Sequence, residues 1–389
     1  MSSSALTGGD IARGLGGKSR VRWPLRRSSD LFDLRYGKSL VASRRRPGRV
    51  PVFGTNGQTG THDTPLFAGP GVIVGRKGAG HLGVHWTDND YWVIDTAYSL
   101  VPKTQIDLRF AYYLLNYVGL DHLKHGTSNP SLTREAFGAQ YFPVPPFEEQ
   151  RAIAGMLDAL DRRIESNHRA ISLIENLSRS IFRQWRATTP TDRMMTFGAF
   201  ADVYGGATPK TTVAKYWDGE LAWATPTDVT ALSAPYLFST GRRITAEGLA
   251  NCSATLHPVG TIFMTSRATI GEFAINMTPA ATNQGFIAVR PRRSADRWFL
   301  FEEMRSRIPE FLDNANGSTF MELSRGRFRD LPLSLPGREQ IDALATEIAP
   351  LHTKATQLSG ESRRIAHLRQ TLLPELVSGR IRGPAEATE

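Results

Sequence analysis

The sequence predicts a mixed α/β (α+β) fold, in which two related globular domains are joined by two long antiparallel coiled-coil helices. Three observations support this prediction: a divergent internal repeat, an apolar period of about 3.5 residues in two long segments, and short β-branched or aromatic runs between Gly and Pro elsewhere. The chain has 389 residues, of which 40% are hydrophobic. This is enough to build a core in each of two domains.

The internal repeat is clearest in two segments. HGTSNPSLTREAF (125–137) resembles NGSTFMELSRGRF (316–328), with a glycine, a leucine, an arginine and a phenylalanine at the same places. Farther upstream, residues 69–86 resemble residues 257–275, since each has a β-rich run, a basic turn and a second run entered by glycine. A long repeat of this kind indicates two copies of one structural unit. We therefore expect a flexible tail at 1–20, a globular domain at 21–147, a central helical spacer at 148–187, a second globular domain at 190–337, a C-terminal helical spacer at 338–378 and a tail at 379–389.

Both long segments have the apolar spacing of a coiled-coil seam, with residues alternately three and four apart. Prolines precede the first segment, and carboxylates follow in the first turn, where they suit the helix dipole. Gly379 is expected to end the second helix, and Pro350 is expected to kink it or break its first turns. The residues expected to pair the helices are Ile153, Leu157, Leu160, Ile164, Asn167, Ile171 and Ile174 in the first, and Ile341, Leu344, Ile348, Leu351, Leu358 and Ile365 in the second.

Two such helices would each be about 55–60 Å long at ~1.5 Å per residue. If they pair, the second must run antiparallel to the first, and the pair would hold the two domains apart as a rigid strut. That length is about one and a half turns of B-DNA at ~34 Å per turn. The alternative is that each helix packs on its own domain as an ordinary core helix.

The charge distribution favours a polyanionic ligand. The formal net charge is +10, and residues 1–50 hold twelve Lys or Arg against three Asp or Glu. Such basic clusters suit a phosphate backbone, although a solvated basic tail would look the same. The sequence has no apolar run of about 18 residues, and its N-terminus has no signal-like apolar region. The single cysteine, Cys252, fits a reducing compartment, so we expect a cytoplasmic protein.

Motifs for catalysis are missing from the sequence. There is no G-x-x-x-x-G-K-[ST] phosphate loop, no Asn/Asp-Pro-Pro-Tyr/Phe motif and no Asp…Glu-x-Lys constellation. The histidines and the one cysteine do not have the spacing of a zinc site. We therefore expect no catalytic residue and no metal site.

Several segments resemble the specificity (S) subunits of type I restriction–modification systems: FPVPPFEEQRAIAGMLDALDRRIE (142–165), VYGGATPKTTVAKYWDGELAWATPTDV (203–229) and LRQTLLPELVSGRI (368–381). The resemblance covers nearly the whole chain after the N-terminal tail. It implies two target-recognition domains, each reading one half of a bipartite site on double-stranded DNA. It also implies that the two helices set the spacing and dock two methyltransferase (modification) subunits. S-adenosylmethionine, ATP and Mg²⁺ would then be bound by those subunits and by a restriction/translocase subunit, not by this chain.

Candidate DNA contacts are basic or small polar residues in turns and loops, several of them at matching places in the repeat. Phosphate contacts would fix the register, and side chains at base edges would read the sequence. The candidates are Arg44, Arg45, Arg46, Asn56, Gln58, Arg76, Lys77, Thr127, Ser128, Arg134, Lys210, Thr225, Arg267, Ser318, Thr319 and Arg325.

Several of these residues also fit purely structural roles. Asn56 could belong to an Asn-Gly hairpin turn, Thr127 and Ser128 could cap the next helix, and Arg134 and Arg325 could form intramolecular salt bridges. For the whole chain, the alternative is a stand-alone, two-headed DNA-binding regulator without a methyltransferase partner.

Overall fold

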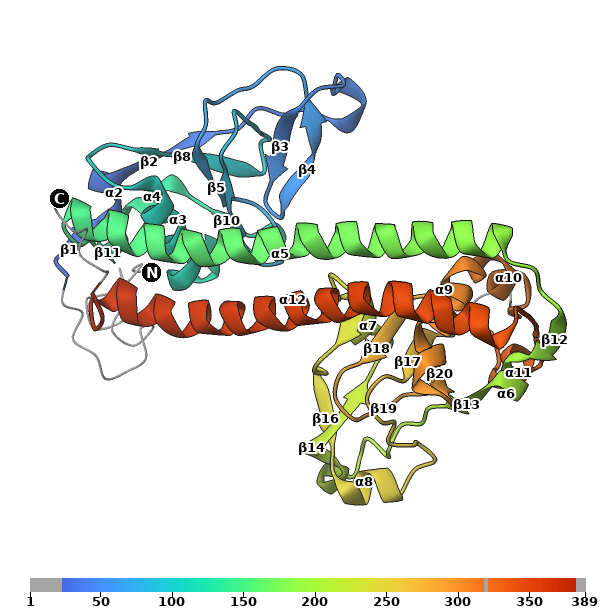
Figure 1. Cartoon of the computed structure of the whole chain (residues 1–389). Coiled ribbons are helices and arrows are strands. Elements are labelled where there is room, and N and C mark those ends of the chain that lie inside the picture. The colour runs from blue at the N-terminus through green and yellow to red at the C-terminus, as the bar shows by residue number, and fades with distance from the viewer. Residues whose placement is uncertain (1–22, 318–320, 383–389) are drawn as a thin grey trace. The chain divides into compact units, whose positions relative to one another are not determined.

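The structure is a computed structural model that describes residues 23–317 and 321–382. It divides into two compact units: unit 1 combines the chain up to Arg163 with the segment from Ile365 onward, and unit 2 comprises Ile164–Arg364. Two long helices, α5 (Phe147–Thr188) and α12 (Arg338–Ser378), each contribute to both units (Figure 1). Among the described helices, none is both long enough and apolar enough to cross a membrane.

The globular part of unit 1 is built on two sheets. The first has the order β2-β8-β5-β6 and is antiparallel throughout, and the second has the order β4-β3-β7, in which only β3 and β7 are parallel. The strands are β1 (Leu25–Arg27), β2 (Phe32–Tyr36), β3 (Val50–Gly54), β4 (Gly57–His62), β5 (Gly71–Gly75), β6 (Val84–Thr87), β7 (Trp92–Val93), β8 (Ala97–Pro102), β9 (Lys124–His125), β10 (Ser131–Leu132) and β11 (Tyr141–Pro143). The helices are α2 (Ser28–Leu31), α3 (Leu108–Val118) and α4 (Arg134–Gly138), with short 3₁₀ turns at Ala42–Arg44 and Asp121–Leu123.

The globular part of unit 2 repeats this topology. The order β13-β20-β17-β18 corresponds to β2-β8-β5-β6 and gains an edge strand, β15, parallel to β18; the order β16-β14-β19 corresponds to β4-β3-β7. The strands are β12 (Arg193–Thr196), β13 (Ala201–Gly205), β14 (Trp217–Ala224), β15 (Tyr236–Leu237), β16 (Arg242–Ile244), β17 (Ile262–Thr265), β18 (Phe273–Asn276), β19 (Ala280–Thr282), β20 (Phe286–Pro291) and β21 (Pro332–Leu335). The helices are α6 (Phe197–Phe200), α7 (Pro226–Thr230), α8 (Ala246–Ala250), α9 (Arg297–Ser306), α10 (Ile308–Asp313) and α11 (Arg325–Asp330), with 3₁₀ turns at Ala214–Tyr216 and Ser294–Asp296.

Helix α3 shows how local sequence forms the core of unit 1. Asp107 caps its N-terminus, because the carboxylate accepts a hydrogen bond from the Phe110 amide at 2.7 Å. Phe110 and Leu114 are fully buried and lie four residues apart, so one face of the helix covers the first sheet. Burying each such side chain stabilises the fold by about 1.5–3 kcal/mol. Gly119 then ends the helix with φ +67°.

The long helices pair antiparallel within each unit. In unit 1, Leu157 of α5 shares a core with Leu376 of α12, and Asp161 forms an ion pair with Arg369. In unit 2, Ile171 shares a core with Leu358, and the Ser178 hydroxyl and His352 Nε2 share a hydrogen bond of 2.9 Å. Residue numbers rise along α5 as they fall along α12, which confirms the predicted antiparallel pair.

Every residue predicted to pair the helices is buried or half-buried. The alternative, that the helices serve as core helices of their own domains, is also partly correct. Ile153 lies in the core of the first globular domain, and Ile341, Leu344 and Ile348 lie in the core of the second. The same apolar residues of the two helices therefore pair the helices and also contribute to the cores of the globular domains. The fully buried members are Ile153, Leu157, Asn167, Ile171, Ile341, Leu344, Ile348 and Leu358, and the half-buried ones are Leu160, Ile164, Ile174, Leu351 and Ile365.

Pro350 was predicted to kink the second helix or to break its first turns; the break does not occur, because α12 continues from Arg338 to Ser378. A proline inside a helix costs about 3 kcal/mol. Ile348 before it and Ala355 after it are fully buried. Such burial on both sides outweighs that cost. The prediction for Gly379 is confirmed, since it follows α12 with φ +75°.

Asn167 lies in the seam with 2% of its surface exposed, and its Nδ2 has no hydrogen-bond partner among the described residues. A buried polar group without a partner costs about 1–3 kcal/mol. Asn167→Leu is therefore expected to raise the free energy of unfolding by about 1 kcal/mol, measured by urea denaturation. Ser172→Leu at an exposed position of the same helix is the control, and it should change little. An Asn167→Leu variant that is less stable than the parent would show that this amide is satisfied in solution.

Candidate nucleic-acid interface

Three loops of the first globular domain meet on one surface. The Thr55 hydroxyl, in the turn between β3 and β4, lies 2.8 Å from the carbonyl oxygen of Lys77 in the loop after β5. That loop in turn contacts the segment between β9 and β10, because the Gly78 amide donates to the Pro130 carbonyl at 3.0 Å. The predicted residues Asn56, Arg76, Lys77, Thr127 and Ser128 are thus brought together from three separate places in the sequence.

Two predicted arginines meet at an aromatic ring that the sequence did not single out. The guanidinium groups of Arg76 and Arg134 each lie 4.8 Å from the ring centre of Tyr36, which remains 46% exposed. Cation–π contacts of this kind hold a guanidinium in place without neutralising its charge. The Arg76 side chain also donates to the Asp95 carbonyl at 2.9 Å, and Lys77 Nζ lies 3.7 Å from the Asp95 carboxylate. Arg134 has no ion pair within the described part of the chain.

Burial, together with a smaller contribution from a hydrogen bond to Tyr36, raises the pKa of the Tyr98 hydroxyl, which lies beside this cluster, to about 12. The Tyr98 hydroxyl donates to the Leu132 carbonyl at 3.0 Å. The Tyr98 ring therefore adds no negative charge beside Arg76 near neutral pH.

Of the three arginines at 44–46, two make contacts within the domain and one does not. Arg45 donates to the Thr59 carbonyl at 2.6 Å, and Arg46 forms a two-bond contact with Asp63 at 2.6 and 3.0 Å. This hydrogen bond from Arg46 holds the pKa of the Asp63 carboxyl below its usual range. Arg44 is exposed, and its side chain has no partner among the residues described.

The turn of β3 and β4 is the hairpin that its Asn-Gly pair allows, with Gly54 paired to Gly57 around Thr55 and Asn56. Gly57 adopts φ +106°, which favours glycine at this place. Asn56 and Gln58 are nevertheless exposed, and Gln58 Nε2 donates to the Gly60 carbonyl at 3.3 Å. Thr127 and Ser128 are exposed and do not cap α4, because Thr133 does so by accepting from the Ala136 amide at 3.1 Å.

In the second globular domain, the corresponding two loops are also joined by a backbone hydrogen bond, but the side chains on them differ. The Leu323 amide donates to the Ser266 carbonyl at 3.0 Å, which joins the loop after β17 to the segment before α11. Arg267 is paired with Glu322 at 2.8 Å, whereas Arg325 is exposed and has no ion pair among described residues.

Glycine replaces tyrosine at the matching place of the second domain. Tyr36 ends β2 opposite Tyr98, and Gly205 ends β13 opposite Ile287. A Cβ on Gly205 would lie 3.8 Å from Cδ of Arg325, as Tyr36 lies beside Arg134. The two domains therefore present matching arginines, but only the first supports its arginine on an aromatic ring.

The remaining candidates of the second domain have mixed roles. The Lys210 side chain is exposed, and its carbonyl accepts from the indole of Trp217 at 3.2 Å. Thr225 caps α7, because its amide and hydroxyl both donate to Asp228, at 2.8 and 2.6 Å. Ser318 and Thr319 lie outside the described residues. The sequence also gave no sign of Arg242, whose guanidinium lies 3.7 Å from the ring centre of Trp217.

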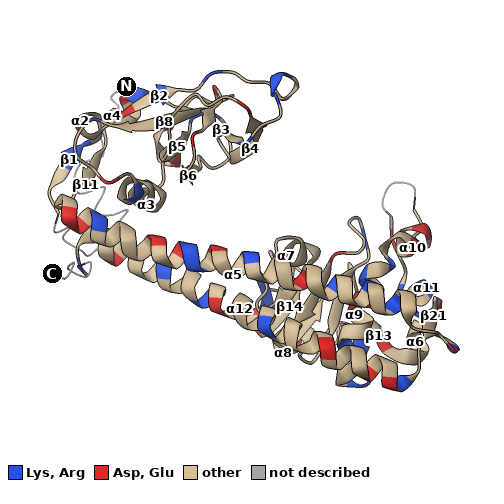
Figure 2. Ribbon diagram, turned by 45° about the horizontal axis from the view of Figure 1, so that its top comes forward, with Lys and Arg blue, Asp and Glu red and all other residues tan. Residues whose placement is uncertain are grey.

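Lysine and arginine residues occur on loops of both globular domains and along both long helices, where acidic residues alternate with them (Figure 2). In the described part of the chain, no group of three or more His, Cys, Asp or Glu side chains is arranged to hold a metal ion. What the loops offer is a set of cations and amides at the surface, which suits contacts to phosphates and base edges.

Comparisons with known proteins agree with this description. A family model described as the type I restriction modification DNA specificity domain matches residues 20–176 and again residues 193–348. The chain is 35% identical over 150 residues to the type I restriction enzyme MjaIX specificity subunit of Methanocaldococcus jannaschii, an alignment covering 38% of this chain and 35% of that protein. It is 26% identical over 127 residues to the type I restriction enzyme HindI specificity subunit of Haemophilus influenzae, covering 32% of this chain and 28% of that protein. These alignments span about a third of the length of each relative.

Among solved structures, the type I restriction–modification system S subunit from M. genitalium has a similar fold. The TM-score is 0.64 at 20% sequence identity, over 93% of this chain and 98% of that chain. The similarity confirms the predicted architecture of two mixed domains joined by long helices.

Proposed function

Because the chain belongs to the type I restriction modification DNA specificity domain family in both of its halves, we propose that it is the non-catalytic DNA-specificity subunit of a type I restriction–modification complex. Each globular domain reads one half of a bipartite DNA site. The observation that carries this proposal is the repeated loop surface, at which exposed arginines recur at matching places, Arg134 in one domain and Arg325 in the other.

In each domain the cations bind phosphates, and the neighbouring polar turns reach base edges. Arg134 and Arg76 form a phosphate clamp, since the Tyr36 ring fixes both guanidinium groups at 4.8 Å. Asn56 stands at the tip of a hairpin, where a side-chain amide can pair with the edge of adenine. In the second domain, Arg267 and Arg325 stand at the places that match Lys77 and Arg134, and Lys210 is a further exposed cation.

The long helices set the spacing of the two half-sites and dock two methyltransferase subunits. Those partners bind S-adenosylmethionine and methylate adenine, and a restriction/translocase subunit uses ATP and Mg²⁺ to move and cut DNA. This chain contributes specificity only. The complex acts on host DNA in the cytoplasm.

The test is to express the chain with and without its cognate methyltransferase subunit and to map adenine methylation across host DNA by single-molecule sequencing. We expect a bipartite methylated motif only when both proteins are present, and we expect one half of that motif to change when residues 21–147 are exchanged for those of a relative. Tight sequence-specific binding by the chain alone, with no complex formed, would instead favour a stand-alone regulator.

The phosphate clamp makes a separate prediction. Arg134→Ala is expected to weaken duplex binding by roughly tenfold at low salt, the equivalent of one charge-assisted hydrogen bond. It should also reduce the slope of log affinity against log salt concentration by about 1. Fluorescence anisotropy over a salt series measures both. Arg46→Ala serves as the control, because Asp63 already occupies that guanidinium; equal slopes for the two variants would refute the clamp.

A further inference from the structure

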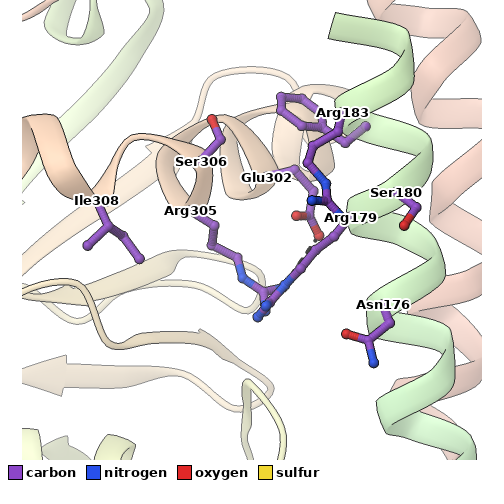
Figure 3. Close-up of a pocket in the computed structure, with 9 residues that line it drawn as sticks. Asn176, Arg179, Ser180, Arg183, Glu302, Arg305, Ser306 and Ile308 are labelled. Atoms are coloured by element: carbon purple, nitrogen blue, oxygen red, sulfur yellow. Dashed lines mark hydrogen bonds and ion pairs between the residues drawn. The ribbon is translucent and has the colours of Figure 1, made fainter. Parts of the chain in front are cut away.

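A cavity of ≈ 420 Å³ lies between α5 and α9, entirely within unit 2. Phe182 and Ile308 give its wall an apolar part. Its polar lining comes from the exposed side of α5 and from the end of α9. Figure 3 shows these polar residues, which are Asn176, Arg179, Ser180 and Arg183 of α5 and Glu302, Arg305 and Ser306 of α9.

The three arginines of the cavity are not equivalent. Arg305 is only 10% exposed and already faces two carboxyl groups, because its guanidinium lies 3.4 Å from Glu302 and 3.3 Å from Glu175. Arg179 and Arg183 are exposed and make no hydrogen bond or ion pair with any other residue that the structure describes. In Figure 3 the Arg179 side chain reaches across toward Arg305. Arg179 is close enough to Glu175 to oppose the rise in the pKa of that carboxyl, but no carboxylate among the described residues is in direct contact with Arg179 or Arg183. Two exposed guanidinium groups beside a cavity suit a further carboxylate, which arginine binds through two parallel hydrogen bonds.

Apolar side chains continue the same surface along α5. Leu173 and Leu177 are one turn apart and are 70% and 49% exposed. Asn176 and Ser180 lie beside them on the helix and connect them to the arginines. Exposed leucines add nothing to a contact with a DNA backbone, but together with arginine they are typical of the centre and rim of a protein interface.

The internal repeat shows that the combination of exposed leucines and arginines on α5 is not repeated at the matching place of α12. Leu368 of α12 stands at the place that matches Leu177 and is also exposed, at 47%. However, Gln370 and Pro374 stand where Arg179 and Arg183 stand on α5. An acidic partner group would therefore find these two arginines on α5 in unit 2 and not at the matching place of α12.

We infer that this surface of α5 receives the methyltransferase subunit, with an acidic side chain of that subunit in the cavity against Arg179 and Arg183 and apolar side chains on Leu173 and Leu177. The inference rests on the proposed function and adds the chemistry of the contact. The partner is recognised as a protein segment that carries a carboxylate next to apolar residues.

The experiment uses the full chain and its cognate methyltransferase subunit, with affinity measured by biolayer interferometry. Arg179→Glu/Arg183→Glu is expected to weaken binding by about 30-fold or more, because it places two repelling charges at the contact. The control is Lys354→Glu/Arg364→Glu, which makes the same change of charge at exposed positions of α12 in the same unit and should alter the affinity less than threefold. Leu177→Asp tests the apolar part, and a roughly tenfold loss is expected.

The outcomes separate the possibilities. Equal affinities for the two double variants would overturn the inference while leaving the proposed function intact, since the wild-type chain would still bind. A matching loss of duplex binding by Arg179→Glu/Arg183→Glu in the absence of the methyltransferase subunit would assign the arginines to DNA and also overturn it. If the wild-type chain binds no methyltransferase subunit at all, the proposed function fails and the inference fails with it. Restoration of binding when an acidic partner residue is changed to Lys would identify the group that enters the cavity.

Discussion

Glu302→Ala is expected to lower the free energy of unfolding by about 3–5 kcal/mol, because it breaks a buried polar network and removes one of the two carboxylates that face its cation. Glu302 is 2% exposed, and its carboxylate lies 3.4 Å from Arg305 and 3.5 Å from His352 Nε2. Removing it leaves Arg305 with Glu175 as its one remaining carboxylate among the described residues. Urea denaturation monitored by circular dichroism measures the loss.

Glu310→Ala is a closely matched control for this change. Glu310 also pairs with an arginine three residues away, Arg307, at 2.6 Å, but its side chain is 37% exposed. An ion pair whose carboxylate stays in contact with water contributes about 1 kcal/mol, so the control should lose much less stability to urea than Glu302→Ala does. If Glu302→Ala and Glu310→Ala lower the free energy of unfolding equally, burial is not the reason why the Glu302 network stabilises the fold.

The second large effect concerns pH. Burial raises the pKa of Glu175 to about 7, and the nearby Glu302 carboxylate adds to this, whereas Arg179 and His352 oppose it. Arg305 faces the group as well, at 3.3 Å, yet the Oε1 atom of Glu175 is buried without a hydrogen-bond partner among the described residues. The charged form is therefore disfavoured in the folded state.

Between the ordinary pKa of a glutamate and pH 7, the folded chain binds more protons at Glu175 than the unfolded chain does. The contribution of this group to stability is thus complete at low pH and is lost as the pH rises through about 7. Glu175→Gln should be about 2–3 kcal/mol more stable than the parent at pH 8, at about 1.4 kcal/mol per pKa unit, and should match it near pH 4.

The measurement is the difference in unfolding free energy between parent and Glu175→Gln from pH 4 to pH 8.5. Glu165→Gln, at an exposed position of the same helix with an ion pair to Arg169, should give a flat difference and is the control. A Glu175→Gln variant that is less stable at pH 8 would mean that the ion pair with Arg305 outweighs burial.

The sequence was most informative where burial follows a period. The spacing of Ile153, Leu157, Ile341 and Leu344 predicts the buried seam, because a residue's position on a helix decides which way its side chain faces. A local rule offered a kink or a break at Pro350, and the break does not occur, because such a rule contains no account of the core that surrounds α12 on both sides.

The candidate site could be predicted only in part. Arg76 and Arg134 were found because they stand in repeated turns, but their meeting at Tyr36 depends on strand pairing that no short motif encodes. The capping role of Thr225 was missed, although a Thr followed by Pro and then by Asp three residues on is a usable signal for a capped helix. The hydrogen bonds that His352 shares with Ser178 and with Tyr236 join distant segments, and nothing local predicts them.

The cross-helix contacts also limit how such chains can be recombined. Asp161 of α5 and His352 of α12 occupy equivalent positions in the repeat, and so do Ser178 of α5 and Arg369 of α12. In each pair, the two residues are as far apart in the sequence as Gly126 and Gly317 are. A hybrid made of two first halves would set Asp161 opposite Ser178 and deprive its carboxylate of Arg369, while two second halves would set Arg369 against His352. Exchange of specificities between relatives should therefore succeed when the junctions lie outside α5 and α12, so that each helix keeps the partner with which its polar residues are matched.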